Sequence, residues 1–170
     1  KMNALISSCI ERVGDITDRG KIAALVPNLL LGDRMFLLFA IRRVSFGDEY
    51  LLNEACPECN EKTLCKVDLS QLKNKNMPDP MQRLYEVQLS NGVFTFHPPT
   101  GHDEARISAL SNGMDDISLA ILMRSNTYQG LPVNLPMIKS LSVRDRNKLR
   151  SLFDEVEGGV DTEVDFTCDA

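Results

Sequence analysis

Two cysteines separated by two residues form the sharpest chemical motif in this 170-residue sequence. Cys56 and Cys59 share a predicted turn with Pro57. Two thiolates at this spacing can face one tetrahedral zinc ion, about 2.3 Å from each sulfur. The alternatives are a reduced pair of half-buried cysteines or a thioredoxin-like redox pair. The redox reading is disfavoured because such a pair belongs at the N-terminus of a helix, whereas this one joins two predicted strands.

A closed zinc site needs four ligands, so other residues must contribute. Cys65 follows the pair by six residues, which is not a usual zinc-ribbon spacing. Cys168 fits better, because a strand is predicted to run into it and two facing cysteine turns make a zinc ribbon. His97 and His102 are further candidates. Zinc is therefore the one cofactor that we predict, and the candidate ligands are Cys56, Cys59, Cys168 and Cys65.

The remaining motifs do not predict catalysis. His97 ends a predicted strand and His102 lies in the first turn of a predicted helix, and the sequence fixes no acid, base or nucleophile beside either. Glycine-rich phosphate loops are absent. We therefore predict that the protein is not an enzyme. A small cysteine-dependent oxidoreductase is the enzymatic alternative.

Charge and hydrophobicity limit the class of partner. Lys and Arg number 19 and Asp and Glu number 24, so the net charge is −5, which argues against general affinity for nucleic acid or anionic membranes. The longest apolar run, Met35 to Ile41, has about a third of the roughly 20 residues that a membrane span needs. We therefore expect neither nucleic acid nor a membrane as partner.

Hydrophobic periodicity predicts an α+β fold in which helices pack around short antiparallel hairpins. One hairpin carries the Cys-x-x-Cys turn and is zinc-ribbon-like, and Asn91-Gly92 predicts the turn of a second. Helices are predicted at 3–13, 21–26, 35–44, 101–110, 115–123 and 142–156, and strands at 49–55, 64–69, 84–89, 93–97 and 160–167.

A polar, proline-punctuated segment predicts a boundary in the chain. Residues 73–83 contain Pro78 and Pro80 and few apolar side chains, which is typical of a linker. We therefore divide the chain into an N-terminal part, 1–72, and a C-terminal part, 84–170. The alternative is that both parts form one compact unit.

The helix predicted at 35–44 is apolar on nearly every side. Such a helix must be covered from several directions, either by the core of its own domain or by another subunit. The basic face at 144–150 is a place where an acidic partner could bind, although such faces are commonly only solvated. Loops 73–80 and 126–137 are further interface candidates. The residues that we predict at an interface are Arg34, Met35, Phe36, Leu38, Phe39, Arg42 and Arg43.

Short motifs follow one another along the chain in a characteristic order. A pair of charged residues precedes the apolar helix, and a basic, glycine-containing motif ends it. The cysteine turn, a proline-rich turn and a closing strand come next. These motifs are Asp33-Arg34, Arg42-Arg43-x-Ser45-x-Gly47, Cys56-Pro57-x-Cys59, Val67-Asp68-Leu69, His97-Pro98-Pro99-Thr100-Gly101-x-Asp103-Glu104 and Gly159-Val160-Asp161.

In order and spacing, this series resembles the baseplate-hub and tail-assembly protein family of contractile-tailed bacteriophages. The resemblance covers most of residues 30–170, with Asn60 where that family often has glycine. It implies a structural or assembly component of the tail baseplate that acts through protein–protein interfaces and has no enzymatic activity. It also implies other baseplate and tail proteins as partners, several copies per assembly, and a location in the virion tail, with assembly in the host cytoplasm. The competing hypothesis is a zinc-ribbon adaptor that binds nucleic acid or protein in a cell.

Overall fold

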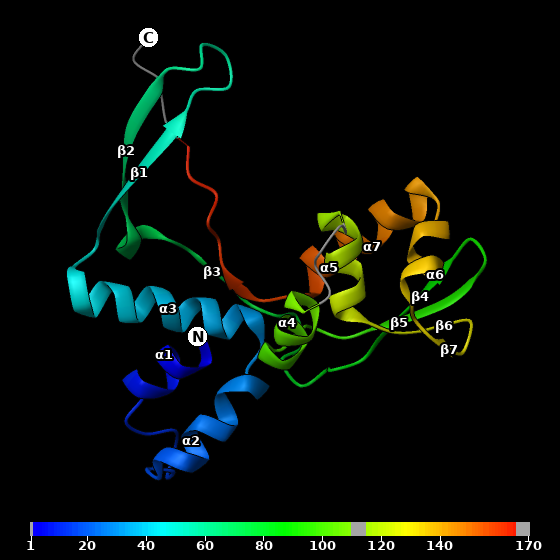
Figure 1. Cartoon of the computed structure of the whole chain (residues 1–170), viewed down its shortest axis with the longest axis horizontal. Helices are drawn as coiled ribbons and strands as arrows, with labels where there is room; N and C mark the ends of the chain where they lie inside the picture. The colour runs from blue at the N-terminus through cyan, green and yellow to red at the C-terminus, as the bar shows by residue number, and fades with distance from the viewer. Residues whose placement is uncertain (1, 110–114, 166–170) are drawn as a thin grey trace.

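Helices and small antiparallel sheets are mixed along the chain in the computed structural model, which describes residues 2–109 and 115–165 (Figure 1). The predicted α+β class is therefore confirmed. The described elements are α1 (Met2–Cys9), α2 (Arg19–Leu25), η1 (Val26–Asn28), α3 (Leu31–Phe46), β1 (Glu49–Ala55), β2 (Lys62–Asp68), η2 (Leu69–Gln71), β3 (Asn74–Lys75), β4 (Tyr85–Leu89), β5 (Gly92–Phe96), α4 (Gly101–Ser108), α5 (Asp116–Arg124), β6 (Ser125–Tyr128), β7 (Leu131–Pro132), α6 (Leu135–Ser140), α7 (Val143–Val156) and β8 (Gly159–Val160).

The larger hydrophobic core lies in the C-terminal half. Its base is the four-stranded antiparallel sheet β4-β5-β6-β7. The helices α4, α5, α6 and α7 contribute further buried side chains to this core. Phe96 on β5 stacks on Tyr85, with ring centroids 5.4 Å apart. It also makes a T-shaped contact with Phe153 on α7, with ring centroids 5.0 Å apart. Alternation along β5 places Phe94 and Phe96 on the same buried face, as the sequence pattern predicts.

The smaller core lies in the N-terminal half and is formed by α1, α2, η1 and α3. Its buried apolar side chains are Ile6, Ile22 and Val26, with half-buried side chains of α3 packed against them. The two cores lie on either side of segment 73–83, and β3 inside that segment pairs with β8 near the C-terminus. The division into two domains stays a prediction.

The apolar helix is longer than its sequence pattern indicates. α3 begins at Leu31, four residues before the predicted start, and Asp33 lies in its first turn. Leu30 occupies the cap position, and its hydrocarbon side chain cannot cap the helix. The Leu31 N–H instead donates to the Pro99 carbonyl. Gly47 ends the helix with φ of 84°, a left-handed conformation that glycine adopts at little cost.

The helix predicted at 3–13 ends at Cys9, and two later segments differ more strongly from the structure. The loop predicted at 126–137 contains most of β6, all of β7 and the start of α6, which Asn134 caps through the Met137 N–H. The strand predicted at 160–167 is short: β8 stops at Val160, residues 161–165 form no strand, and residues 166–167 lie outside the described residues. Both errors concern elements of six residues or fewer, which carry little periodicity.

Among residues 2–109 and 115–165, no helix combines the length and the hydrophobicity that crossing a bilayer requires.

Candidate functional site

An antiparallel hairpin projects from the C-terminal end of α3 (Figure 1). We call it the arm; it comprises residues 49–68. Its seven residue pairs run in register from Glu49 opposite Asp68 to Ala55 opposite Lys62. The described structure places no third strand beside it, and Leu51 and Leu64 are exposed on one face. Two-stranded hairpins are marginally stable alone in water, so the arm is suited to docking against another surface.

Exposed apolar side chains continue from the arm onto α3. Val44 is 91% exposed and Phe46 is 77% exposed, and both lie in the last turn of the helix next to the arm. Leu38 and Phe39 are half-buried, and Leu38 packs against the N-terminal core. We call the exposed set the α3–arm surface, and its members are Met35, Phe36, Val44, Phe46, Tyr50, Leu51 and Leu64.

Arg34 was predicted at the interface, but its side chain is only 1% exposed. One guanidinium nitrogen donates to Asn3 Oδ1 at 2.6 Å and to the Val26 carbonyl at 3.2 Å, and the other pairs with Glu104 Oε2 at 2.8 Å. Arg34 therefore joins α1, η1, α3 and α4 inside the molecule. Its charge is compensated within the chain, so Arg34 does not belong to the α3–arm surface.

Two further arginines hold the joint between α3 and the arm. Arg42 donates to the carbonyls of Gly47 and Glu49, and its guanidinium lies 4.9 Å from the centroid of the Phe46 ring. Arg43 pairs with Asp48 at 2.5 Å on the exposed surface. These contacts fix the direction in which the arm leaves the helix, which is a positioning role. Their predicted role in an interface stays a prediction, as it does for Met35, Phe36, Leu38 and Phe39.

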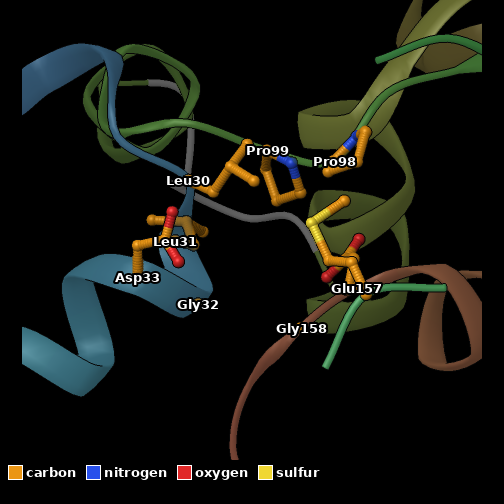
Figure 2. A pocket seen from close by; sticks show the side chains of 9 residues that line it. Leu30, Leu31, Gly32, Asp33, Pro98, Pro99, Glu157 and Gly158 are labelled. Carbon is orange, nitrogen blue, oxygen red and sulfur yellow. The ribbon is translucent and has the colours of Figure 1, made fainter. Parts of the chain in front are cut away.

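The N-termini of α3 and α4 meet at one junction (Figure 2). Leu30 and Thr100 form an isolated antiparallel bridge, and Leu31 N–H donates to the Pro99 carbonyl at 2.8 Å. Gly32 and Gly158 line a small pocket there together with Leu30 and Pro99. A Cβ added to Gly32 would lie 2.1 Å from the Gly158 carbonyl oxygen, so only glycine allows this approach. The junction fixes α3, and hence the arm, relative to the C-terminal core.

Beside the junction lies a histidine–aspartate pair that the sequence did not reveal. His97 contacts Asn126 Oδ1 through Nδ1 at 2.8 Å and Asp103 Oδ2 through Nε2 at 3.2 Å. Thr100 donates to the same carboxylate from its N–H and its hydroxyl, and the two residues form a capping box at the start of α4. Since the Thr100 hydroxyl is engaged by this carboxylate, the cluster stabilises the start of α4.

We expect Asp103 to contribute stability that is lost in acid. Burial raises the pKa of its carboxyl, but the hydrogen bonds from Thr100 and His97 outweigh burial, so the pKa lies below its usual value. The unfolded chain, with a pKa of about 3.9, therefore takes up the proton at higher pH than the folded chain does, and stability falls as the pH drops below about 4. Urea midpoints at pH 6 and pH 3 measure this loss. The difference in urea midpoint between the parent and Asp103→Asn should be smaller at pH 3 than at pH 6. An equal difference at the two pH values would contradict this assignment.

The cysteine turn lies at the outer end of the arm. Cys56 N–H donates to the Glu61 carbonyl at 2.9 Å, and Asn60 N–H donates to the Cys56 carbonyl at 2.8 Å. Asn60 has φ of 61°, so it adopts the left-handed conformation for which glycine is the usual residue and asparagine a tolerated one. Cys56 is half-buried and Cys59 is exposed. The turn therefore has the tight form that the sequence predicts.

The other predicted ligands are placed differently. Cys65 lies opposite Leu52, three pairs away from the end of the ladder, and is buried. Cys168 lies outside the described residues. His97 is engaged at the junction, and within residues 2–109 and 115–165 no group of three or more histidine, cysteine or acidic side chains is arranged to hold a metal ion. The structure thus brings together Cys56 and Cys59 but not Cys65.

The basic face of α7 is partly used inside the chain. Arg146 donates to the carbonyls of Ile138 and Lys139, and Lys148 donates to the Gln88 carbonyl. These bonds attach α7 to α6 and to β4. An acidic partner at residues 144–150 remains untested, as do the interfaces predicted at 73–80 and 126–137.

Comparison with known proteins gives one family. A family model described as T4 bacteriophage base plate protein matches residues 1–125. No curated protein and no solved structure gives a significant match to the chain. The matched region includes α3, the arm and the junction, and it leaves out α6 and α7.

Proposed function

Because this chain belongs to the T4 bacteriophage base plate protein family, we propose that it acts in the hub region of a phage tail baseplate and docks onto neighbouring tail proteins through the α3–arm surface. The family supports a structural, non-enzymatic protein of the phage tail. The hub position, several copies per particle and assembly in the host cytoplasm are part of the proposal.

The observation that carries the proposal is the exposure of apolar side chains where α3 meets the arm. Val44, Phe46 and Leu51 lie on adjoining elements and are at least half exposed. Exposed apolar side chains that gather on adjoining elements are typical of sites of protein–protein contact. The charged groups beside it, Arg43 and Asp48, already neutralise each other, so a partner need not supply a countercharge. A partner with an apolar centre and a polar rim therefore suits this surface.

The geometry of the arm adds to this argument. Among the described residues β1 and β2 pair only with each other, so their outer edges offer backbone N–H and C=O groups to a further strand. Adding such a strand is one way in which proteins recognise extended segments. Docking would also bury the face that carries Leu51 and Leu64. Both effects would stabilise a hairpin that is marginal on its own.

We expect the double variant Val44→Gln/Phe46→Gln to fold normally and to enter tails at least tenfold less efficiently than the parent. Removing two apolar anchors from an interface costs about 1 to 2 kcal/mol each, and about 1.4 kcal/mol is tenfold in affinity. The measurement is quantitative mass spectrometry of the chain in purified tails, with the melting temperature of the free protein as the check on folding.

Val143→Gln provides the matched control. Val143 is 75% exposed at the start of α7, on a different part of the molecule from the α3–arm surface. This variant should enter tails as the parent does. Equal incorporation of the Val44/Phe46 variant and the parent would reject the α3–arm surface as the docking site.

A further inference from the structure

The hydrogen bonds at the two ends of the arm show which backbone groups of β2 point away from β1. At one end, Cys56 N–H donates to the Glu61 carbonyl at 2.9 Å. At the other end, Leu69 N–H donates to the Asp48 carbonyl, also at 2.9 Å. Hydrogen-bonded and non-hydrogen-bonded pairs alternate along an antiparallel ladder. Counting inward from either end, the residues of β2 whose N–H and C=O groups point outward are Lys62, Leu64, Lys66 and Asp68.

This outer edge of β2 can accept a further strand. Within the described residues β2 pairs only with β1, and Figure 1 shows the arm extending away from the helices of both cores. The C-terminal segment comes near, since Val164 and Asp165 line a cleft together with Lys66. Residues 161–165 nevertheless form no strand beside β2. An unpaired strand edge of this kind is a template for pairing with another chain.

The charges along β2 favour a second copy of the same strand as the partner. Lys62 begins β2 and Asp68 ends it, and both side chains are exposed. If two β2 strands pair antiparallel about a two-fold axis at Cys65, Lys62 of each copy lies opposite Asp68 of the other. Asp68 already accepts a hydrogen bond from the Ser70 N–H at 2.9 Å, but a carboxylate accepts several. The arrangement therefore gives two symmetric pairs of opposite charge.

The same arrangement also satisfies the backbone. Leu64 of one copy lies opposite Lys66 of the other, so residues with outward N–H and C=O groups face one another and can exchange hydrogen bonds. A shift of the register by two residues would instead place Lys66 opposite Lys62 or opposite its own counterpart, and like charges directly opposite are unfavourable. The β1 edge offers no equivalent, because its charged residues, Glu49 and Glu54, are both acidic.

We propose that two copies of this chain associate through the outer edges of their β2 strands and form one four-stranded sheet in the order β1-β2-β2-β1. The two-fold axis passes between the Cys65 residues of the two copies. A four-stranded sheet is stable where an isolated hairpin is marginal, so pairing supports both arms. The proposal does not depend on the docking of tail proteins, because it uses the backbone edge of β2 and two charged side chains outside the α3–arm surface.

Sedimentation equilibrium of the purified chain, without tail proteins, tests the proposal. The parent should show a reversible monomer–dimer equilibrium with a dissociation constant below about 1 mM. Lys62→Asp and Asp68→Lys should each weaken the dimer at least tenfold, because both pairs of opposite charge become pairs of like charge. Lys62→Asp is the cleaner variant, since it leaves the hydrogen bond from Ser70 to Asp68 intact.

Mixing the two charge variants distinguishes pairing between copies from an effect inside one chain. An equimolar mixture of Lys62→Asp and Asp68→Lys should dimerise as the parent does, because each variant supplies the charges that the other lacks. Within one chain the two positions lie six residues apart on β2, or roughly 20 Å. The recovery therefore cannot come from a contact inside one copy. Melting temperatures of the separate variants check that each is folded.

Proline substitutions test the edge itself. Leu64→Pro removes an outward N–H from β2, and Asn53→Pro removes an outward N–H from β1 at the residue directly opposite. Proline is tolerated where the N–H of an edge strand faces away from its partner. Leu64→Pro should therefore weaken the dimer at least tenfold, whereas Asn53→Pro is the matched control and should dimerise as the parent does.

Three results would overturn this pairing. The first is a parent chain that stays monomeric at about 1 mM or forms larger oligomers in place of a dimer. The second is a mixture of folded charge variants that fails to restore the dimer. The third is equal dimerisation of the two folded proline variants. Each result concerns the purified chain alone, so it is distinguishable from a failure of the docking function, which is measured in assembled tails.

Discussion

Replacing Arg34 with methionine is expected to lower the free energy of unfolding by about 3 kcal/mol. The guanidinium is 1% exposed and satisfies Asn3, the Val26 carbonyl and Glu104 at once. Methionine fills similar space but leaves these acceptors without a donor, and removing one partner of a buried ion pair costs roughly 3 to 5 kcal/mol. The lower end of that range applies, because the Glu104 side chain is one-third exposed and can regain water. Urea denaturation followed by circular dichroism measures the change.

Arg43→Met on the same helix is the matched control. Arg43 forms an exposed ion pair with Asp48, and such pairs contribute about 0 to 1 kcal/mol. For a chain of this size, the loss of about 3 kcal/mol expected for Arg34→Met corresponds to a melting temperature roughly 6 to 12 °C lower. If the two methionine variants unfolded at the same urea concentration, Arg34 would not hold the helices together as described.

Gly32→Ala should destabilise the junction by about 2 kcal/mol. The added Cβ would lie 2.1 Å from the Gly158 carbonyl oxygen and 3.0 Å from the Gly159 Cα, so the backbone around β8 must move. Overpacking of this kind costs roughly 1 to 3 kcal/mol, which exceeds the gain of up to about 1 kcal/mol from replacing a helical glycine. Hydrogen exchange should show faster exchange of amides in β3 and β8.

Gly20→Ala is the same substitution in a helix with more room. The closest atom to its added Cβ is the Asp18 carboxylate oxygen at 3.2 Å, which belongs to a side chain and can shift. We expect a change of less than about 0.5 kcal/mol, since the propensity gain and this contact offset each other. A Gly32→Ala protein as stable as Gly20→Ala would show that β8 does not pack tightly on α3.

Elements with strong local signals were predicted well from the sequence. The Asn91-Gly92 turn predicted the β4–β5 hairpin, and the strands fall within one residue of the expected bounds. Ser142 caps α7 through the Asp145 N–H, and the helix spans Val143–Val156 where 142–156 was predicted. Turn and cap chemistry depends on a few neighbouring residues, so it can be read without the rest of the fold.

The site depended on contacts that local patterns do not encode. Arg34 looked like a flanking surface charge, but its partner Glu104 lies 70 residues away. His97 and Asp103 are close in sequence, yet Asn126 completes their cluster from β6. The sequence did predict that α3 is apolar on several sides; only the structure shows which of those sides the N-terminal core covers and which remain exposed.

The junction between Leu30 and Thr100 has a consequence for synthesis on the ribosome. The helices α1 to α3 emerge first, but the bridge to Thr100 and the acceptor Glu104 for Arg34 are each translated 70 residues later. At 5 to 20 residues per second, that delay is roughly 4 to 14 s. During this interval the N-terminal core of the nascent chain has three buried apolar side chains, and Arg34 has no Glu104 with which to pair. We expect this unfinished core to be stable only after the second half closes the junction.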